Sequence, residues 1–188
     1  MKEKLLRQAG REYAPWQRLL ALAALAPVFL LFLPLALIRG AARLDQALHL
    51  PRLPGGRALQ MLGGLMTVAG WLLGMWSNAA EFELGRGTPV PLMATQRLVV
   101  EPPFTYTRNP MALGAILMYL GVALLRRSLA GVGIVLTAAA ALLVYIKRVE
   151  EHEMVARFGQ EYLAYRERTP FLLPRLMACR NSSMANAG

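Results

Sequence analysis

Cysteine is almost absent from the chain, because Cys179 is the only one among the 188 residues. A single cysteine forms no disulfide within its own chain, and it cannot build a cysteine-rich metal site. The sequence therefore predicts a fold without covalent cross-links and without a bound metal ion.

Acidic residues are also scarce. Eleven aspartates and glutamates stand against 21 lysines and arginines, which leaves a net charge of +10. On a soluble domain such an excess would point to nucleic acid. Here the basic residues sit at the ends of apolar stretches, which is typical of membrane topology and of contact with lipid headgroups. We therefore expect a lipid bilayer, and no nucleic acid, as a partner; the sequence indicates no oligomeric state.

Long polar stretches are missing from most of the chain, which is 56% hydrophobic with a mean hydropathy of +0.39. A helix that crosses a bilayer needs roughly 20 apolar residues. Residues 19–38 and 59–80 reach this length, whereas residues 111–125 are short and residues 129–146 are marginal. Only residues 126–128 separate the last two, which predicts a tight helical hairpin. The expected fold is an all-α integral membrane protein with about four transmembrane helices.

The segments between these spans define the expected organisation. The first span is too long for the apolar core of a signal peptide, so we interpret it as a retained helix. A loop is expected over residues 40–57, and a long middle loop over residues 81–104. Within a single domain we expect three parts, namely N-terminal membrane helices (1–84), a cofactor-binding loop with the hairpin and C-terminal motif (85–176), and a disordered tail (177–188).

The distribution of basic residues predicts the orientation. With four spans, both termini and the middle loop lie on one side of the membrane, and that side carries most of the lysines and arginines. The positive-inside rule places this side in the cytosol. We therefore expect a protein of the bacterial or archaeal inner-membrane type, with its termini and its polar motifs in the cytosol.

Two polar motifs flank the predicted hairpin. In the first, Asn109 and Pro110 are typical of a helix start, because Asn is favoured at the N-cap and Pro at the first helical position. The positive end of that helix would suit an anion such as a carboxylate. In the second, neither Gly nor Pro interrupts residues 147–158, so the last span should continue beyond the membrane to about Phe158. Gly159 should end it, and a short helix is expected over residues 161–168.

The order and spacing of these motifs resemble one family. The chain has Arg108-Asn109-Pro110-Met111, then Glu150-Glu151, then Phe-Gly-Gln-Glu-Tyr-Leu-Ala-Tyr-Arg-Glu-Arg-Thr-Pro-Phe-Leu-Leu-Pro over residues 158–174. This pattern, which spans roughly residues 85–174, resembles the isoprenylcysteine carboxyl methyltransferases and phospholipid methyltransferases of membranes. The resemblance implies S-adenosylmethionine as cofactor and a lipophilic, membrane-embedded or lipidated acceptor.

The resemblance also implies site residues. Those expected to bind the cofactor are Gln96, Arg97, Leu98, Val99, Phe104, Asn109, Pro110, Met111, Ala112 and Glu150. Those expected to take part in catalysis are Arg108, Glu150 and Glu151, with His152 and Arg148 as further candidates. The C-terminal signature, which includes Phe158, Gly159, Tyr162, Tyr165 and Arg168, is interpreted as mainly structural.

Two departures from the family pattern concern the acceptor. The family commonly has Tyr at the position of Ala112, and an arginine that serves the substrate carboxylate at the position of Ile146. Lys147 and Arg148 are adjacent, but successive helical residues point about 100° apart. The acceptor therefore stays open between a prenylcysteine-like carboxylate, a phospholipid amine and a small thiol.

Other interpretations remain beside this one. Lys147, Arg148, Glu150 and Glu151 could form ordinary ion pairs along one solvated helix face. A non-enzymatic membrane protein such as a small transporter would show ionisable residues in mid-span, and the four predicted spans have none. Membrane reductases that use a nicotinamide cofactor share a similar C-terminal hairpin. Whether the protein binds a nicotinamide nucleotide or S-adenosylmethionine would distinguish a reductase from a methyltransferase.

Overall fold

A computed structural model describes residues 14–85 and 96–174, in which helices are joined by turns and irregular segments and no strand occurs. This confirms the predicted all-α class. In chain order the helical elements are α2 (Pro15–Pro27), the π-helical η1 (Val28–Phe32), α3 (Leu33–Ala47), α4 (Gly56–Glu83), α5 (Pro110–Leu125), α6 (Leu129–Tyr145), the π-helical η3 (Ile146–Glu150), α7 (Glu151–Phe158) and α8 (Gln160–Arg168).

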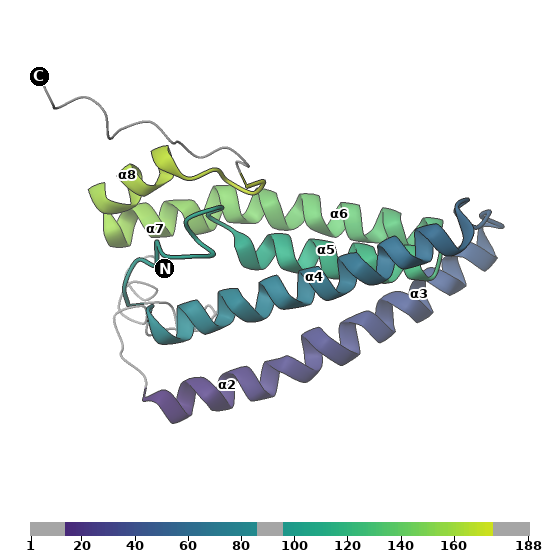
Figure 1. Ribbon diagram of the computed structural model, residues 1–188, viewed down its shortest axis with the longest axis horizontal. Helices are drawn as coiled ribbons and strands as arrows, with labels where there is room; N and C mark the ends of the chain where they lie inside the picture. The colour runs from purple at the N-terminus through teal and green to yellow at the C-terminus, as the bar shows by residue number, and fades with distance from the viewer. Residues whose placement is uncertain (1–13, 86–95, 175–188) are drawn as a thin grey trace, which may run out of the picture.

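The long helices run roughly side by side and give the molecule two distinct ends (Figure 1). At one end lie the start of α2, the end of α4 and the start of α5, together with α7 and α8. We call this the motif end, because Arg108 and Glu151 belong to it. At the other end lie the end of α3, the start of α4 and the turn at residues 126–128, and we call this the hairpin end.

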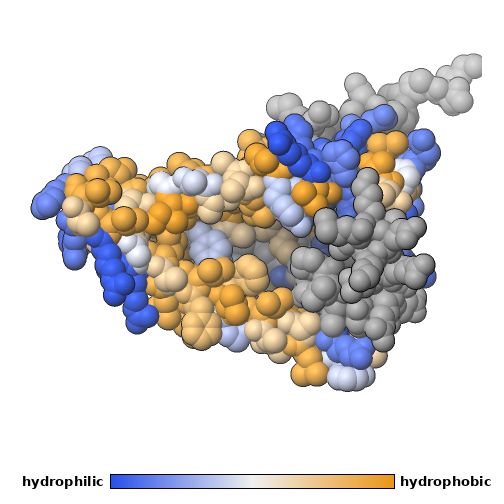
Figure 2. All heavy atoms as spheres, turned by 180° about the vertical axis from the view of Figure 1, so that it is seen from behind, coloured by the Kyte–Doolittle hydropathy of each residue, from blue (hydrophilic) through white to orange (hydrophobic). Residues whose placement is uncertain are grey.

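Three helices are long and apolar enough to cross a membrane, namely Trp16–Ala47, Gly56–Glu83 and Leu129–Phe158. Figure 2 shows hydrophobic side chains over much of the length between the ends, and hydrophilic ones gathered at the ends. The protein is thus built as an integral membrane protein. The fourth predicted span, α5, is an apolar helix of 16 residues. At about 1.5 Å per residue it is roughly 24 Å long, less than the roughly 30 Å of a hydrocarbon core.

The first helix is longer than the sequence predicts. A loop is expected over residues 40–57, but this prediction is wrong for residues 40–47, because α3 continues to Ala47. Pro27 does not end the helix either, since the π-helical turn η1 follows it without a break and leads into α3. Beyond Gly40 the chain reads Ala-Ala-Arg-Leu-Asp-Gln-Ala, in which good helix formers predominate. Local propensity therefore extends the helix by two turns.

Close packing of α4 on α5 connects the two ends. A Cβ atom at Gly70 or Gly121 would collide with the backbone of the other helix, and Gly63 and Gly114 meet the facing backbone in the same way. Small residues allow membrane helices to approach at this distance. Gly63 and Gly70 thus allow the close approach of α4 and α5, whereas a Cβ at Gly74 would meet nothing within 4 Å.

The last span leaves the apolar region as one continuous helix, as predicted. Residues Leu129–Phe158 are helical without interruption, through α6, η3 and α7. Gly159 then turns the chain with a positive φ of 54°, a conformation that costs little only for glycine. Helix α8 follows at the expected place, so the end of the chain folds back toward the start of α5.

Candidate functional site

An apolar cluster holds the motif end together. Its buried members are Ala80, Val99, Phe104, Tyr162 and Tyr165, and Leu98, Met154, Val155 and Phe158 pack against it. These residues come from the end of α4, the segment before α5, and helices α7 and α8. The Tyr165 hydroxyl donates a hydrogen bond of 2.7 Å to the backbone carbonyl of Phe104. The cluster thus fixes the segment that carries Arg108 relative to the helix that carries Glu151.

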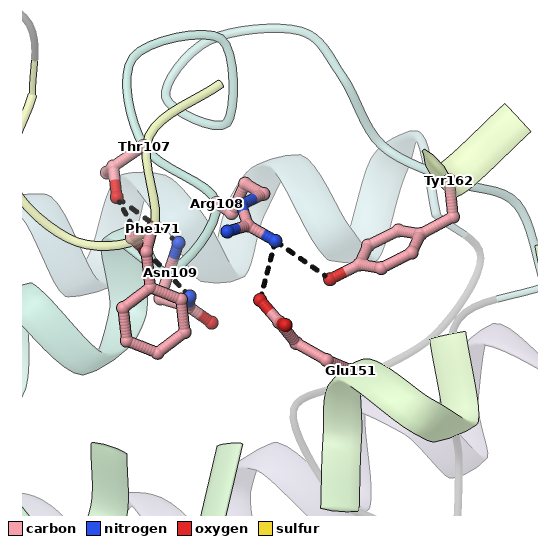
Figure 3. A network of polar contacts seen from close by, with 6 residues as sticks. All are labelled: Thr107, Arg108, Asn109, Glu151, Tyr162 and Phe171. Carbon is pink, nitrogen blue, oxygen red and sulfur yellow. Dashed lines mark hydrogen bonds and ion pairs between the residues drawn. The ribbon is translucent and has the colours of Figure 1, made fainter. Parts of the chain in front are cut away.

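Arg108 and Glu151 form an ion pair across this junction. The Arg108 Nη1 atom lies 2.5 Å from Glu151 Oε1, and the two side chains are only 11% and 13% exposed. The same nitrogen donates a longer bond of 3.4 Å to the Tyr162 hydroxyl, and the guanidinium lies 5.5 Å from the centre of the Phe171 ring. Figure 3 shows the guanidinium pointing toward Glu151 and Tyr162. The two motifs, 43 positions apart in sequence, therefore meet in the fold.

The start of α5 is held by the chain segment that follows α8. The Arg108 backbone N–H donates to the Pro170 carbonyl at 2.9 Å, and the Asn109 side-chain amide donates to the Phe171 carbonyl at 2.8 Å. The Thr107 hydroxyl donates to the same carbonyl at 3.3 Å. Residues 169–171 thus act as a strap over the segment before α5, a contact visible in Figure 3.

The predicted helix start, with Asn109 at the N-cap and Pro110 at the first helical position, is confirmed, but the Asn109 side chain does not cap the helix. Helix α5 begins at Pro110 with Asn109 at the N-cap, yet the Asn109 side chain makes no capping hydrogen bond. Its amide is engaged with Phe171 instead, and its backbone N–H donates to the Thr107 hydroxyl at 3.3 Å. The side chain therefore leaves the first-turn N–H groups of α5 uncapped, at the positive end of the helix.

Glu150 lies on the π-helical turn η3 and is half-buried. Such wide turns inside α-helices are frequent at functional sites, because they change the direction of the side chains that follow. Glu150 lies near two other carboxylates and is repelled by both, Glu81 at the end of α4 and Glu153 on α7. Three carboxyl groups in one region suit a cationic ligand, because a positive charge would offset their mutual repulsion.

The interpretation as an ordinary solvated helix face is not supported. Lys147 and Arg148 are exposed, and within the described parts of the chain neither makes an ion pair. Glu151 pairs instead with Arg108, from a different element. The charged residues of η3 and α7 are therefore arranged around a tertiary contact.

Three buried polar atoms lack a hydrogen-bond partner in the described structure, and all three belong to the motif end. They are Arg18 Nε, Asn78 Oδ1 and Arg108 Nε. Arg18 reaches from α2 to the last turn of α4, where it donates to the Phe82 carbonyl at 2.9 Å. Asn78 lies one turn earlier on α4. Buried polar groups rarely stay unsatisfied in native proteins, so this end of the molecule has capacity for a polar ligand.

The remaining predicted site residues occupy several environments. The backbone N–H groups of Gln96 and Arg97 both point to the Gly85 carbonyl, at 2.7 and 3.3 Å. Val99 and Phe104 lie in the apolar cluster, with Leu98 packed against it. On the first turn of α5, Pro110 is buried, and Met111 and Ala112 are half-buried. On the helix extension, Arg148 and His152 are exposed.

Some residues of this site were not singled out by sequence. Thr107, Phe171, Asn78 and Glu81 contribute contacts, unsatisfied atoms or charge. Only Phe171 could have been found from the sequence, because it lies in the Thr-Pro-Phe run of the C-terminal signature. The other three sit in segments whose local pattern is that of an ordinary helix or loop.

The two tyrosines of the cluster act as neutral groups. Burial raises the pKa of Tyr162 above its ordinary value, and the charge of Glu151 adds to that effect while Arg108 opposes it. Burial likewise raises the pKa of Tyr165. Both hydroxyls therefore keep their protons at neutral pH, which supports a structural role.

A family model described as phospholipid methyltransferase matches residues 59–161. The match covers more than half of the 188 residues, and it includes Arg108, Asn109, Glu150 and Glu151. No curated protein and no solved structure matches the chain.

Proposed function

Because the chain belongs to the phospholipid methyltransferase family of membrane methyltransferases, we propose that it transfers a methyl group from S-adenosylmethionine to a lipophilic acceptor at the motif end. The observation that carries this proposal is the buried ion pair between Arg108 and Glu151. It joins the segment before α5 to the extension of α6, which supports the assignment of Asn109 and Glu150 to one site.

The residues at the motif end fit the proposed cofactor. S-adenosylmethionine carries a cationic sulfonium that supplies the methyl group, an ammonium, a carboxylate and a polar nucleoside. Glu150, with Glu81 nearby, suits the cationic groups. The uncapped first turn of α5 suits the carboxylate. Asn78 Oδ1 and Arg108 Nε are buried polar atoms that a nucleoside can satisfy.

Positioning supplies most of the proposed catalysis. Methyl transfer is an in-line displacement, so holding donor and acceptor in line accounts for a large share of the rate. The apolar cluster packs α7 and α8 against the segment before α5. The ion pair between Arg108 and Glu151 adds a second contact between the same parts. In this scheme Arg108 and Glu151 position the site, while Glu150 contacts the cofactor.

The acceptor proposed here is the amine of a phospholipid. Ile146, at the position where the family can have a carboxylate-binding arginine, is only 4% exposed, so its side chain packs inside the protein. Lys147 and Arg148, the next two residues of the helix, are exposed and suit a headgroup phosphate. An amine must lose a proton, and His152 is the exposed candidate base because Glu151 is engaged with Arg108. A prenylcysteine-like carboxylate, which needs no base, is the second candidate.

The proposed orientation places the motif end in the cytosol, where S-adenosylmethionine is available. The start of α2 and the end of α8 lie together at that end (Figure 1). An inner membrane of the bacterial or archaeal type fits this arrangement, and the excess of basic residues on that side supports it.

Cofactor binding tests the proposal directly. Calorimetry on the detergent-solubilised protein should show S-adenosylmethionine binding for the wild type and at least tenfold weaker binding for Glu150→Gln. Glu161→Gln, which changes an exposed carboxylate on α8, is the matched control and should bind normally. Absence of binding to the wild type, or binding of a nicotinamide nucleotide in its place, would overturn the proposal.

The acceptor requires a second measurement. Labelled methyl transfer should be followed into phosphatidylethanolamine, a prenylcysteine analogue and a small thiol, with the same protein preparation. The proposal expects label in the phospholipid. Label only in the prenylcysteine analogue would establish the carboxylate alternative while leaving the cofactor assignment intact.

A further inference from the structure

The hairpin end contains a cavity of about 560 Å³ that the motif-end site does not use. Its walls come from the second half of α3, the segment 49–52, the end of α5 and the turn into α6. This volume lies within the range of roughly 300–1,000 Å³ that is usual for sites of small organic ligands. Because the two ends lie at opposite extremes of the long helices (Figure 1), the cavity is separate from the proposed methyl-transfer site.

The lining of the cavity is divided into an apolar wall and a cationic rim. The apolar wall includes Leu37, Ile38, Ala41, Val122 and Ala123, from α3 and α5. The rim carries the cations Arg52, Arg126 and Arg127, and His49 lies beside them in the lining. An apolar wall that leads to arginines at a helix end matches a molecule with a hydrocarbon chain and an anionic head.

The positive charge of the rim is not cancelled by the acid that lies beside it. Asp45 is the only carboxylate among the described residues that line the cavity. One of its oxygens accepts a hydrogen bond of 2.5 Å from the Ser128 hydroxyl, and the other accepts a bond of 2.9 Å from the Ala130 N–H. Asp45 therefore serves the N-terminus of α6, and Arg52 and Arg126 stay exposed at the rim.

The rim is held in a defined conformation. The Leu53 N–H donates to the Arg127 carbonyl at 3.0 Å, and Arg127 Nε donates to the Leu53 carbonyl at 2.8 Å. His49 and Arg127 have φ values of 49° and 52°, and they are the two non-glycine residues with positive φ in the described chain. Both line the cavity. Non-glycine residues keep such conformations only where the surrounding structure imposes them.

We propose that this cavity binds an anionic phospholipid, with its phosphate between Arg52 and Arg126 and one acyl chain along the wall of α3 and α5. Arginine suits phosphate because its planar guanidinium donates paired hydrogen bonds. The ends of membrane helices lie at the level of the lipid headgroups. A free inorganic phosphate would leave the apolar wall unused, so the lipid is the source that the whole lining fits.

Such a lipid would add contacts between two parts of the molecule that already meet where Asp45 of α3 holds the start of α6. One wall belongs to α3, and the other belongs to α5 and the turn into α6. A ligand that binds only the folded arrangement of these walls stabilises it by mass action. The bound phospholipid therefore acts as a structural ligand at the membrane face opposite the proposed methyl-transfer site.

Lipid titration with matched variants tests this proposal. The delipidated full chain in neutral detergent is titrated with dioctanoyl-phosphatidylglycerol and observed by native mass spectrometry. The double variant R52Q/R126Q should bind at least tenfold more weakly than the wild type. A42F places a large side chain in the cavity without a change of charge, and it should also bind at least tenfold more weakly.

The controls separate a built site from general attraction. R57Q removes an exposed arginine of the same end that does not line the cavity, and it should bind within twofold of the wild type. Dioctanoyl-phosphatidylcholine should bind at least fivefold more weakly than phosphatidylglycerol, and inorganic phosphate should not compete. The proposal is overturned if R57Q weakens binding as much as R52Q/R126Q does, if A42F binds normally, or if inorganic phosphate displaces the lipid.

Discussion

The two ends of the molecule are both rich in arginine, but they use it differently. At the motif end, Arg108 is nearly buried and paired with Glu151, and three buried polar atoms of that end have no partner in the described structure. At the hairpin end, Arg52 and Arg126 are exposed, and the neighbouring acid, Asp45, is occupied at the start of α6. A buried charge pair with unsatisfied polar neighbours indicates a site for chemistry, whereas exposed arginines beside an apolar wall indicate binding of lipid.

The largest expected effect comes from a change that disrupts the packing of α4 on α5, which connects the two ends. Gly70→Leu should destabilise the protein by at least about 4 kcal/mol, because its side chain would collide with the backbone of α5. The measurement is unfolding in detergent, together with methyl transfer, and both should be lost. Gly74→Ala is the matched control, because a Cβ there meets nothing within 4 Å. If Gly70→Leu is as stable as Gly74→Ala, the close approach of α4 and α5 is wrong.

Removal of Arg108 should affect only the motif end. Arg108→Ala leaves Glu151 charged and nearly buried, so the free energy of unfolding should fall by about 3 kcal/mol. Methyl transfer should fall more than 100-fold. The comparison is Arg57→Ala, an exposed arginine of the hairpin end that does not line the cavity there, which should change both quantities little.

A double variant sharpens that result. Arg108→Ala combined with Glu151→Ala removes both charges, so it should regain part of the lost stability without regaining activity. If the losses of stability in Arg108→Ala and in Glu151→Ala, measured singly, add up to the loss in the double variant, the pair contributes no coupling energy.

The hydrogen bond between Tyr165 of α8 and the segment before α5 should show a smaller effect. Tyr165→Phe removes the hydroxyl that donates to the Phe104 carbonyl, which costs about 1–3 kcal/mol when a buried acceptor is left unpaired. Weaker S-adenosylmethionine binding should accompany the loss, because Phe104 belongs to the same segment as Arg108. Tyr106→Phe changes an exposed tyrosine nearby and should leave stability and binding unchanged.

The smallest expected effect belongs to the hairpin end. Asp45→Ala removes the acceptor for the Ser128 hydroxyl and the Ala130 N–H, so it should cost about 1 kcal/mol, as the loss of a helix cap does. Methyl transfer should stay within twofold of the wild type, since the motif end is not involved. A large loss of activity in this variant would show that the two ends are coupled, in contrast to the separation proposed here.

Features that depend on neighbouring residues could be predicted from the sequence. The turn at residues 126–128, the helix start at Pro110 and the helix end at Gly159 all lie where their residues indicate. These features follow from backbone preferences that act over a few residues. The same logic failed at Gly40, because one glycine among good helix formers does not end a helix that is already formed.

The partner that a polar side chain contacts, when several groups lie nearby, could not be predicted. Asn109 is an ordinary N-cap by sequence, yet its amide is used by Phe171, 62 positions away. Glu150 and Glu151 are equivalent by pattern, yet Glu151 pairs with Arg108 while Glu150 lies on the π-helical turn beside other carboxylates. Such choices depend on the direction in which each side chain points, and one residue along a helix changes that direction by about 100°.

By itself, the sequence determined that the protein is a helical membrane protein, where most of its helices start and end, and that two polar motifs flank one short hairpin. These properties arise from hydrophobicity and from local backbone preferences. Only the tertiary structure decided which carboxylate meets Arg108, which polar atoms stay unsatisfied at the motif end, and that α3 and α5 enclose a cavity with arginines at its rim. These depend on contacts between residues far apart in the chain, because packing sets which side chains share one space.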